Sequence, residues 1–228
     1  MKKADKIPYK RINIFAGHYG SGKTEVAVNY AFMLNNLGYK TAIVDLDIVN
    51  PFFRTADAAK FLEDRGIKVL LPMYANTNVD IPAIPQEIYS LFENKEYHVV
   101  LDIGGDDLGA KAIARFYNEI VSDEYELFYV VNAKRPFTDT LEKIDEMKNE
   151  IEESARLKFT GIVNNTNLLG DTDIDLLSYG DKILNDYTNK TGLPVCFKAV
   201  MADRNFDLAD DGTPVLQMIK TVRLPWDK

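Results

Sequence analysis

The stretch GHYGSGKTE, residues 17–25, decides the fold of this chain. Gly17 is followed by four residues and then by Gly22, Lys23 and Thr24, which is the spacing of a phosphate-binding loop. The apolar run INIFAG leads into the loop and a helical pattern leads out of it. This context separates a phosphate loop from a glycine-rich turn with an incidental Lys-Thr pair. The sequence therefore predicts a fold of the P-loop NTPase kind.

The residues of this loop have separate expected roles. Glycines let backbone amides turn inward around phosphates, and the helix that follows offers its positive N-terminal end. Lys23 is placed to reach the β- and γ-phosphates, and Thr24 to offer its hydroxyl to Mg²⁺. The other residues of the stretch that we expect at the nucleotide are His18, Tyr19, Gly20, Ser21 and Glu25. Since His18 and Tyr19 stand where small or cationic residues are common, an alternative is that they only shape the loop or its lid.

Composition limits the classes of protein that fit. The 228 residues suit one α/β domain, and we predict a single nucleotide-binding domain over residues 1–228. A net charge of −8 weighs against a nucleic-acid partner, because basic side chains supply most of the affinity for phosphates. The single cysteine, Cys196, excludes an intrachain disulfide and fits a reducing compartment. No apolar run is long enough for a signal peptide or a bilayer span, so we expect a cytoplasmic protein with no membrane partner.

Short apolar runs alternate with helical patterns along the chain. Most runs are continuous, as in VVLDI and FYVVN, which is typical of strands buried on both faces. The expected strands span residues 11–16, 41–46, 67–71, 97–103, 126–132, 158–164 and 194–200. Regular alternation of strand and helix predicts the α/β class, with one doubly wound, mainly parallel sheet of about seven strands and helices on both faces.

The helical patterns are of different kinds. Residues 24–37 are apolar nearly all round and predict a deeply packed helix, whereas residues 138–151 carry one apolar stripe and predict a surface helix. The C-terminal stretch PVLQMIKTVRLPWDK is interpreted as a last helix packed on the sheet, in preference to a basic amphipathic membrane helix. The longest irregular stretch, residues 72–85, is a candidate functional loop.

Acidic residues follow two of the expected strands. In DLDIVN, Asp45 and Asp47 fall on the same side of the second strand. In HVVLDIGG, a buried strand ends at Asp102, the position at which a carboxylate commonly orients Mg²⁺ through water. Gly105 leaves room for a backbone amide to approach a γ-phosphate. Because ligands of open α/β sheets bind at the carboxyl ends of strands, these residues should face the phosphate loop. The alternative for the pair in DLDIVN is an exposed acidic strand end.

The stretches GHYGSGKT, DLDIVN and VVLDIGG, in this order, resemble the deviant-loop family of ATPases that includes MinD, ParA and the CobQ/CobB amide-forming synthetases. The resemblance covers most of the chain, from the first strand to the region of Asn164. It implies ATP and Mg²⁺ as cofactors, with Asp47 orienting the attacking water and Asp45 and Asp102 supporting magnesium. It also implies that Asn50 belongs to the first switch segment.

Position 18 departs from the pattern of that family. In its ATPase branch the residue after the first glycine is often a lysine that reaches across a dimer to the partner's nucleotide, and this chain has His18 there. An imidazole is shorter than a lysine side chain and mostly neutral at pH 7, so it does not replace that cation. Arg54 and Lys111 are other candidates to supply one. The resemblance implies that the chain acts on a protein partner, which is unidentified, and that it could form a homodimer when nucleotide is bound.

The stretch GIVNNTNL, residues 161–168, bears on recognition of the base. Guanine-specific proteins of the wider class typically have Asn-Lys-x-Asp at this place, and its carboxylate reads the guanine edge. Here Asn164, Asn165 and Asn167 offer amides and no carboxylate, which favours adenine. The alternative for each asparagine is that it satisfies backbone groups of a turn. Arg135, in the loop after the fifth expected strand, is a candidate phosphate contact or, by preference, a solvated charge.

Three functions compete at this point. The first is a Mg²⁺-dependent ATPase with slow turnover, in which Lys23 and Asp47 are catalytic and the bound nucleotide switches the chain's action on a protein partner. The second is a synthetase of the CobQ/CobB branch, which uses ATP to activate a carboxylate substrate. The third is a nucleotide-binding module that does not hydrolyse, and the presence of Asp47 argues against it.

Overall fold

Eight parallel strands form one sheet, in the order β3-β2-β4-β1-β5-β6-β7-β8. The computed structural model describes residues 6–47, 55–72, 86–105, 107–204, 206–208 and 210–221. The strands are β1 (Ile12–Ala16), β2 (Thr41–Leu46), β3 (Lys68–Leu70), β4 (His98–Ile103), β5 (Tyr125–Val131), β6 (Gly161–Asn164), β7 (Val195–Met201) and β8 (Val215–Met218). The sheet confirms the predicted doubly wound, parallel architecture.

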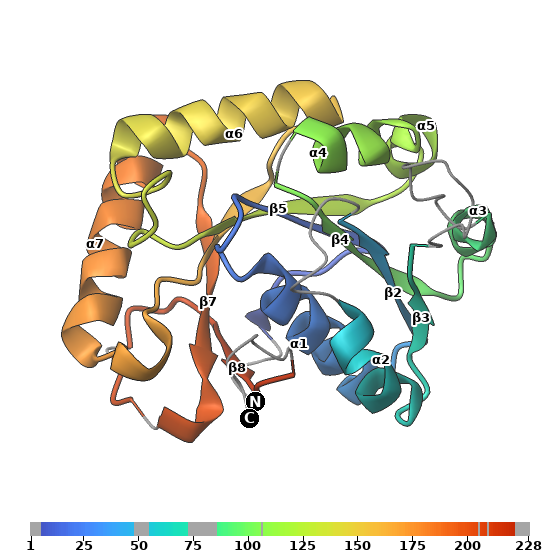
Figure 1. The fold of residues 1–228 in the computed structure, drawn as a ribbon, viewed down its shortest axis with the longest axis horizontal. Helices are drawn as coiled ribbons and strands as arrows, with labels where there is room; N and C mark the ends of the chain where they lie inside the picture. The colour runs from blue at the N-terminus through green and yellow to red at the C-terminus, as the bar shows by residue number, and fades with distance from the viewer. Residues whose placement is uncertain are drawn as a thin grey trace, which may run out of the picture.

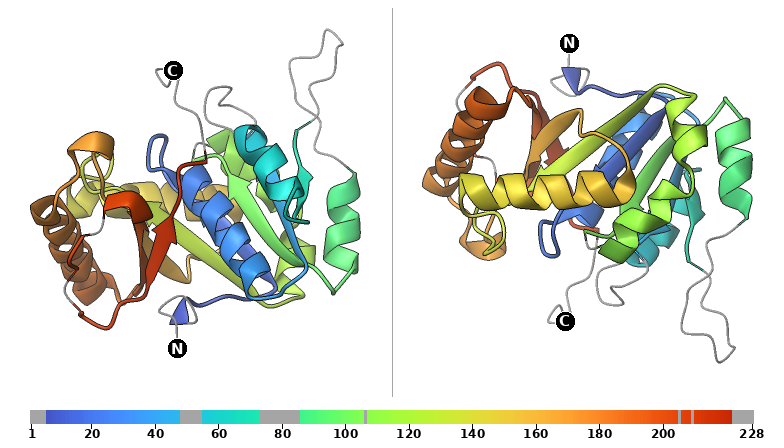
Figure 2. Two further views of the ribbon diagram at one scale, coloured as in Figure 1. Left: turned by 90° about the horizontal axis from the view of Figure 1, so that it is seen from below. Right: turned by 90° about the horizontal axis from the view of Figure 1, so that it is seen from above.

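Helices cover both faces of the sheet, as Figures 1 and 2 show. One face carries α1 (Lys23–Asn36) and α2 (Thr55–Glu63). The other carries α3 (Glu87–Glu93), α4 (Asp107–Ala114), α5 (Tyr117–Val121), α6 (Leu141–Ala155) and α7 (Ile174–Thr191). There are also two short 3-10 turns. η2 (Leu169–Asp171) follows β6 after a short loop, and η3 (Ala202–Arg204) follows β7 directly.

The hydrophobic core lies in two layers, one on each side of the sheet. Alternation along β1 sends Ile12 and Ile14 toward the layer under α3 to α7, and Phe15 toward the layer under α1 and α2. All five residues of β1 are buried, which explains why this strand is apolar without a polar alternate face. The expected contrast between helices is also present, because α1 is buried along most of its length while α6 buries one stripe.

Most predicted strands begin and end within one residue of those observed, but two segments differ. β6 begins at Gly161, three residues later than predicted. The C-terminal stretch does not form the predicted helix: residues 215–218 form the edge strand β8, parallel to β7. Leu216 and Met218 are buried while Gln217 between them is exposed, so the pattern has the period of a strand. Only four residues alternate in this way, too few to distinguish strand from helix by pattern alone.

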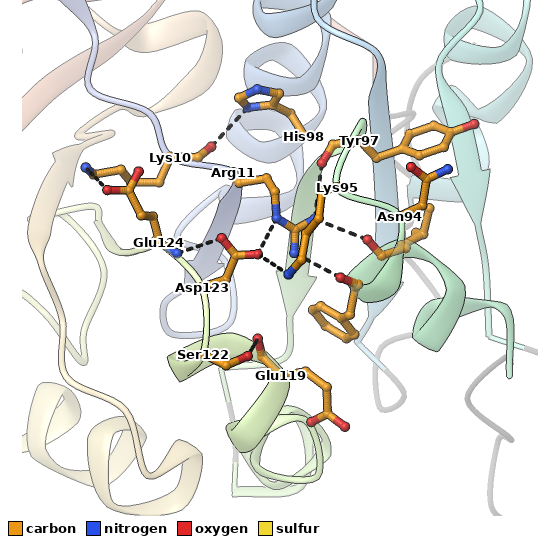
Figure 3. A network of polar contacts seen from close by, with 12 residues as sticks. Lys10, Arg11, Asn94, Lys95, Tyr97, His98, Glu119, Ser122, Asp123 and Glu124 are labelled. Atoms are coloured by element: carbon orange, nitrogen blue, oxygen red, sulfur yellow. Dashed lines mark hydrogen bonds and ion pairs between the residues drawn. The ribbon is translucent and has the colours of Figure 1, made fainter.

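A network of charged and backbone groups joins the amino ends of three strands (Figure 3). Arg11, just before β1, forms an ion pair with Asp123, just before β5. The Arg11 guanidinium also donates hydrogen bonds of 3.2–3.3 Å to the carbonyl oxygens of Leu91, Phe92 and Tyr97. It thereby caps the last turn of α3 and holds the start of β4. Lys95 Nζ completes the network at 2.6 Å from Asp123 Oδ2.

Candidate functional site

The loop between β1 and α1 has the backbone shape of a phosphate cradle. Gly20 and Gly22 have φ angles of 78° and 82°, a left-handed conformation that residues with a side chain rarely adopt. Ser21 N donates to His18 O at 3.0 Å, which closes the turn. Gly22 occupies the N-cap of α1 and offers no side-chain cap, so the first amides of the helix keep their capacity to bind an anion.

Two glycines let neighbouring loops approach more closely than side chains would allow. A Cβ atom on Gly17 would lie 2.4 Å from the carbonyl oxygen of Val130, at the end of β5. A Cβ atom on Gly105 would lie 1.8 Å from the carbonyl oxygen of Gly17. The loop after β4 therefore packs directly against the phosphate loop, with Gly105 beside Gly17.

Three carboxylates and one ammonium group are buried together beside this loop. Lys23 Nζ lies 2.8 Å from Asp47 Oδ2, and Asp47 N donates to Asp45 Oδ1 at 2.9 Å. Asp102 is the strand neighbour of Asp45, because the two residues are paired in the register of β2 and β4. The side chains of Asp45, Asp47 and Asp102 are at most 3% exposed, so the alternative of an exposed acidic strand end is wrong.

The charges of this cluster do not balance. Burial, together with the charge of Asp102, raises the pKa of Asp45 to about 8. Burial also raises the pKa of Asp102 to about 6, although Lys23 opposes this shift. For Lys23, burial lowers the pKa but Asp102, Asp47 and Asp45 more than offset it, so the pKa is raised. A fixed ammonium thus faces three carboxylates, and the excess of negative charge favours a further cation.

The donor set of the cluster fits magnesium bound with a nucleotide. Among the described residues, no group of three His, Cys, Asp or Glu side chains is arranged to hold a metal ion by itself. Mg²⁺ commonly keeps several waters and takes its other ligands from one or two protein oxygens and substrate phosphates. Thr24, whose side chain acts on the Asp102 carboxylate and lowers its pKa, and the buried carboxylates could hold such an ion.

Unpartnered polar atoms gather at the same place. In the described part of the chain, the buried side-chain nitrogen and oxygen atoms without a hydrogen-bond partner are Ser21 Oγ, Asp102 Oδ1 and Asn165 Oδ1. Ser21 belongs to the phosphate loop, Asp102 ends β4, and Asn165 follows β6 and donates to Ser21 O at 2.7 Å. Since buried polar atoms are nearly always satisfied, three such atoms in one place indicate a site that a ligand completes.

A cavity of about 440 Å³ extends from the cluster toward the ends of β6 and β7. Its phosphate-loop end is lined by Lys23, Thr24 and Asp47, and its far end by Asn167, Asp203 and Phe206. One end is thus rich in groups that bind phosphates, and the other combines apolar surface with a few polar groups. This division suits a nucleotide, which has a charged end and a flat, largely apolar end.

The three asparagines after β6 have different roles in the structure. Asn164 Nδ2 donates to Asp181 Oδ1 at 2.8 Å and Asn164 Oδ1 accepts from Thr166 N, so this side chain supports the turn and is not among the cavity-lining residues. Asn165 and Asn167 do line the cavity. Asn167 also stabilises the turn, because its Oδ1 accepts from Leu169 N at 3.2 Å.

Several cavity residues were not singled out from the sequence. Asp203, Arg204 and Phe206 follow β7, and Arg204 donates to the carbonyl oxygens of Leu169 and Gly170 across the cavity's far end. Their position after a parallel strand was the signal that could have found them. Leu169 has a φ of 53°, an uncommon backbone state that tends to occur at functional sites.

Arg135 was interpreted by preference as a solvated charge, and the structure places it at the phosphate loop. Its Nε donates to Gly20 O at 3.0 Å, and the side chain lines the cavity. The neighbouring Phe137 stacks on His18, with ring centroids 4.2 Å apart. Burial lowers the pKa of His18, and Lys23 lowers it further against the hydrogen bond to Tyr19 O, so the imidazole is neutral at pH 7. Tyr19 itself lines the cavity.

Other candidates lie away from this site or outside the described residues. Lys111 lines a separate groove between α4 and α6, together with Arg115 and Arg156. Asn50, Arg54 and most of the stretch 72–85 fall outside the described residues. No described helix has the length and apolar character needed to span a bilayer.

Comparison with known proteins establishes the fold. No protein-family model and no curated protein matches the chain. Among solved structures, the cell division protein FtsY of Thermotoga maritima is similar with a TM-score of 0.58 and 18% identity, over 86% of this chain and 64% of that one. The signal recognition particle receptor FtsY of Elizabethkingia anophelis, in complex with GDP, has a TM-score of 0.53 and 16% identity, over 85% and 57%.

A third structure is the signal recognition particle 54 kDa protein of Aeropyrum pernix in complex with GDP, with a TM-score of 0.50 and 16% identity, over 85% of this chain and 41% of that one. The chain thus spans less than two thirds of the length of these three proteins. Together with the sheet order and the loop geometry, the likeness establishes a P-loop NTPase fold.

Proposed function

We propose that this chain is a Mg²⁺-dependent ATPase that acts as a slow, nucleotide-controlled switch on a protein partner. The observation that carries the proposal is the cluster around Lys23, where an excess of buried carboxylate and three unpartnered polar atoms adjoin a glycine loop and a helix N-terminus. Structural ion-pair networks are usually balanced and satisfied, whereas a site built for a charged ligand is incomplete without it.

The ion pair between Lys23 and Asp47 gives the switch a physical basis. Both side chains are buried and the pair measures 2.8 Å, so without nucleotide Lys23 is held by a carboxylate. The β- and γ-phosphates of a nucleotide compete for the same ammonium group. When they take it, the Asp47 carboxylate is released to orient a water for attack, the role that the family resemblance implies. Nucleotide binding and the release of Asp47 for hydrolysis then occur in one step, in which Lys23 exchanges the Asp47 carboxylate for the phosphates.

The Mg²⁺ ion that accompanies the nucleotide would neutralise charge on its phosphates. In this chain the Thr24 hydroxyl would bind the ion directly. The paired carboxylates of Asp45 and Asp102 would support it through water. The raised pKa values of these two carboxyls describe the site without a cation, and a bound cation favours their ionised forms.

Slow turnover follows from the uncharged side chain at position 18. Neutral His18 stands where the related ATPases often have a lysine, and a cation added by a partner commonly accelerates phosphoryl transfer by about 10³-fold or more. Arg135 is the described cation nearest to fill this role within the chain, since it lines the cavity and contacts the phosphate loop. A protein partner or a second copy of the chain would move Arg135 or supply a further cation.

Guanine is the second candidate for the base. The amides of Asn165 and Asn167 support adenine, because the stretch after β6 has no guanine-reading carboxylate. Asp203, however, offers a carboxylate at the same end of the cavity from the loop after β7, and two structures of similar fold are complexes with GDP. A carboxylate that accepts hydrogen bonds from guanine would reverse the preference.

Parallel titration with Mg-ATP and Mg-GTP, in a calorimeter, tests the base assignment. We expect ATP to bind about 10- to 100-fold more tightly, which is the discrimination that one well-made polar contact commonly supplies. The Asp203→Asn variant should leave that preference unchanged. If GTP binds as well or better, and Asp203→Asn removes its advantage, the nucleotide is GTP and Asp203 reads the base.

A further inference from the structure

Two polar residues on α1 face the C-terminal end of the described chain. Asn29 lies in the middle of the helix, where asparagine is a poor helix former, yet its side chain is only 3% exposed. Glu25 lies one turn earlier on the same face, directly after the phosphate-loop residue Thr24. A buried asparagine in a helix interior calls for a partner that compensates its cost.

The partner of Asn29 is the backbone just beyond β8. Asn29 Oδ1 accepts a hydrogen bond from Ile219 N at 2.9 Å, and Asn29 Nδ2 donates to Ile219 O at 3.0 Å. One side-chain amide therefore satisfies both backbone groups of Ile219, as a neighbouring strand would. The contact joins residues 190 positions apart in the sequence.

Glu25 holds the same segment two residues further on. Its Oε1 accepts from Thr221 N at 2.7 Å and from Thr221 Oγ1 at 2.6 Å. Asn29 Nδ2 also lies 3.2 Å from this oxygen, which ties the two helix residues together. Residues 219 and 221 are thus fixed to the first two turns of the helix that starts at the phosphate loop, and Lys220 is held between them.

Lys220 lines the nucleotide cavity, together with Glu25. Lys23 and Thr24 serve the β- and γ-phosphates at one end of that cavity, and Asn167, Asp203 and Phe206 form the other end. A cation beside Glu25 lies past the residues that serve the terminal phosphates, where the α-phosphate and ribose join the two ends of a bound nucleotide. We propose that Lys220 contacts the α-phosphate, and that Asn29 and Glu25 are positioning residues that hold it there.

This inference rests on the proposed nucleotide site and adds a residue that neither the phosphate loop nor the acidic cluster contains. It also gives two segments far apart in the sequence a shared function, because α1 and the residues after β8 line one wall of the cavity together. Figures 1 and 2 show α1 alongside β8 in this arrangement. ATP and ADP both carry an α-phosphate, so the contact should serve both nucleotides equally.

The test is calorimetric titration of Lys220→Ala with Mg-ATP and with Mg-ADP. We expect both affinities to fall by the same factor, roughly 10-fold, since one charge-assisted contact is lost. Lys220→Arg should restore affinity to within about twofold because it keeps the charge. The matched control is Lys190→Ala, which removes an exposed lysine from the last turn of α7 and should bind as the wild type does.

The positioning residues are tested by coupling to Lys220. Asn29→Ala should lower affinity about as much as Lys220→Ala, and the double variant should lose no more than the larger single loss, because both changes remove one contact. Glu25→Gln keeps the acceptor oxygen for Thr221 and should bind as the wild type, whereas Glu25→Ala should not. Glu25→Ala also serves if Asn29→Ala fails to fold.

Wild-type affinity in Lys220→Ala, while Lys23→Ala loses binding, would overturn this inference and leave the nucleotide site standing. Unequal losses for ATP and ADP would place Lys220 at another phosphate and contradict the assignment. Additive losses in the double variant would show that Asn29 acts independently of Lys220. Wild-type affinity in both lysine variants would instead overturn the proposed function itself.

Discussion

The two ends of the strands hold charged groups in opposite ways, and we call them the amino edge and the carboxyl edge of the sheet. At the amino ends of the strands, Arg11 is surrounded by Asp123 and three carbonyl oxygens (Figure 3). At the carboxyl ends, Lys23 faces three carboxylates, and the described chain's unpartnered buried polar atoms lie beside it. The first edge joins helix and strand ends into one structure, whereas the second is left incomplete.

This contrast separates structural charge from functional charge within one fold. Arg11 is partly buried, and its donors bind an aspartate and three backbone carbonyl oxygens, so the protein itself satisfies this charge. Buried carboxylates in excess, with raised pKa values, cost stability unless a cation compensates them. Substitutions at the two edges should therefore differ in their effects on nucleotide turnover, on stability and on the pH dependence of stability.

The largest expected effect is on turnover, at the carboxyl edge. Asp47→Asn should lower kcat by about 10²- to 10³-fold, because orienting the attacking water is a transition-state role. The affinity for Mg-ATP should stay the same or rise, since Lys23 loses its competing carboxylate partner. Single-turnover assays with separate binding titrations measure both quantities. Unchanged turnover would transfer the role to another residue, with Asp45 the first candidate.

The second effect belongs to the amino edge. Arg11→Ala should lower the free energy of unfolding by about 2 kcal/mol, because three carbonyl oxygens lose this donor and Asp123 keeps only Lys95 and the Glu124 amide. Urea denaturation measures this loss. Nucleotide affinity of the folded variant should equal that of the wild type, since Arg11 lies at the opposite ends of the strands from the cavity. A fall in affinity with unchanged stability would contradict the division between the two edges.

The smallest effect is a difference in the pH dependence of stability. The folded-state pKa of Asp45 is raised to about 8, so the folded state binds more protons than the unfolded state between about pH 4 and 8, and Asp45 makes stability fall as pH rises. Asp45→Asn cannot ionise and keeps the acceptor for Asp47 N. Without nucleotide, it should be more stable than the wild type by roughly 1–3 kcal/mol at pH 8, with little gain at pH 4.5.

Asp123 should have the opposite dependence and serves as the control. Burial raises its pKa, but hydrogen bonds from Lys95 and Arg11 outweigh that effect and lower it overall. A lowered folded-state pKa contributes stability above the unfolded value and loses it as the solution becomes more acidic. Asp123→Asn should therefore cost stability at pH 7 and cost less near pH 3. Equal pH profiles for the Asp45 and Asp123 variants would show that the two edges do not differ in charge balance.

The sequence was most informative where local pattern and tertiary environment agree. Continuous apolar runs predict strands buried on both faces, and β1, β2 and β4 are such strands. The loop from Gly17 to Thr24 could be located because its residue spacing is typical of phosphate-binding loops. The expectation that the carboxylates lie at the same ends of the strands agrees with the pairing of Asp45 with Asp102 in β2 and β4.

Features that depend on contacts between distant segments could not be predicted in the same way. The edge strand β8 is short, and what holds its end is the Asn29 amide on α1, which no local pattern reveals. Arg135 was interpreted as solvated because its charge lies in a loop, and only the folded chain shows its contact with Gly20. The different roles of the asparagines after β6 likewise depend on residues outside that stretch. Asn164 binds Asp181, and Asn165 binds the backbone of Ser21.

The central claim is that the carboxyl edge is an incomplete site that Mg-nucleotide completes through Lys23. The most direct measurement is calorimetric titration of Mg-ATP into Lys23→Ala, beside the wild type and Lys190→Ala. We expect Lys23→Ala to lose at least about 100-fold in affinity, because the phosphates lose their buried ammonium partner, while Lys190→Ala is unchanged and all three proteins give the same circular dichroism spectrum. Wild-type affinity in a folded Lys23→Ala variant would contradict it.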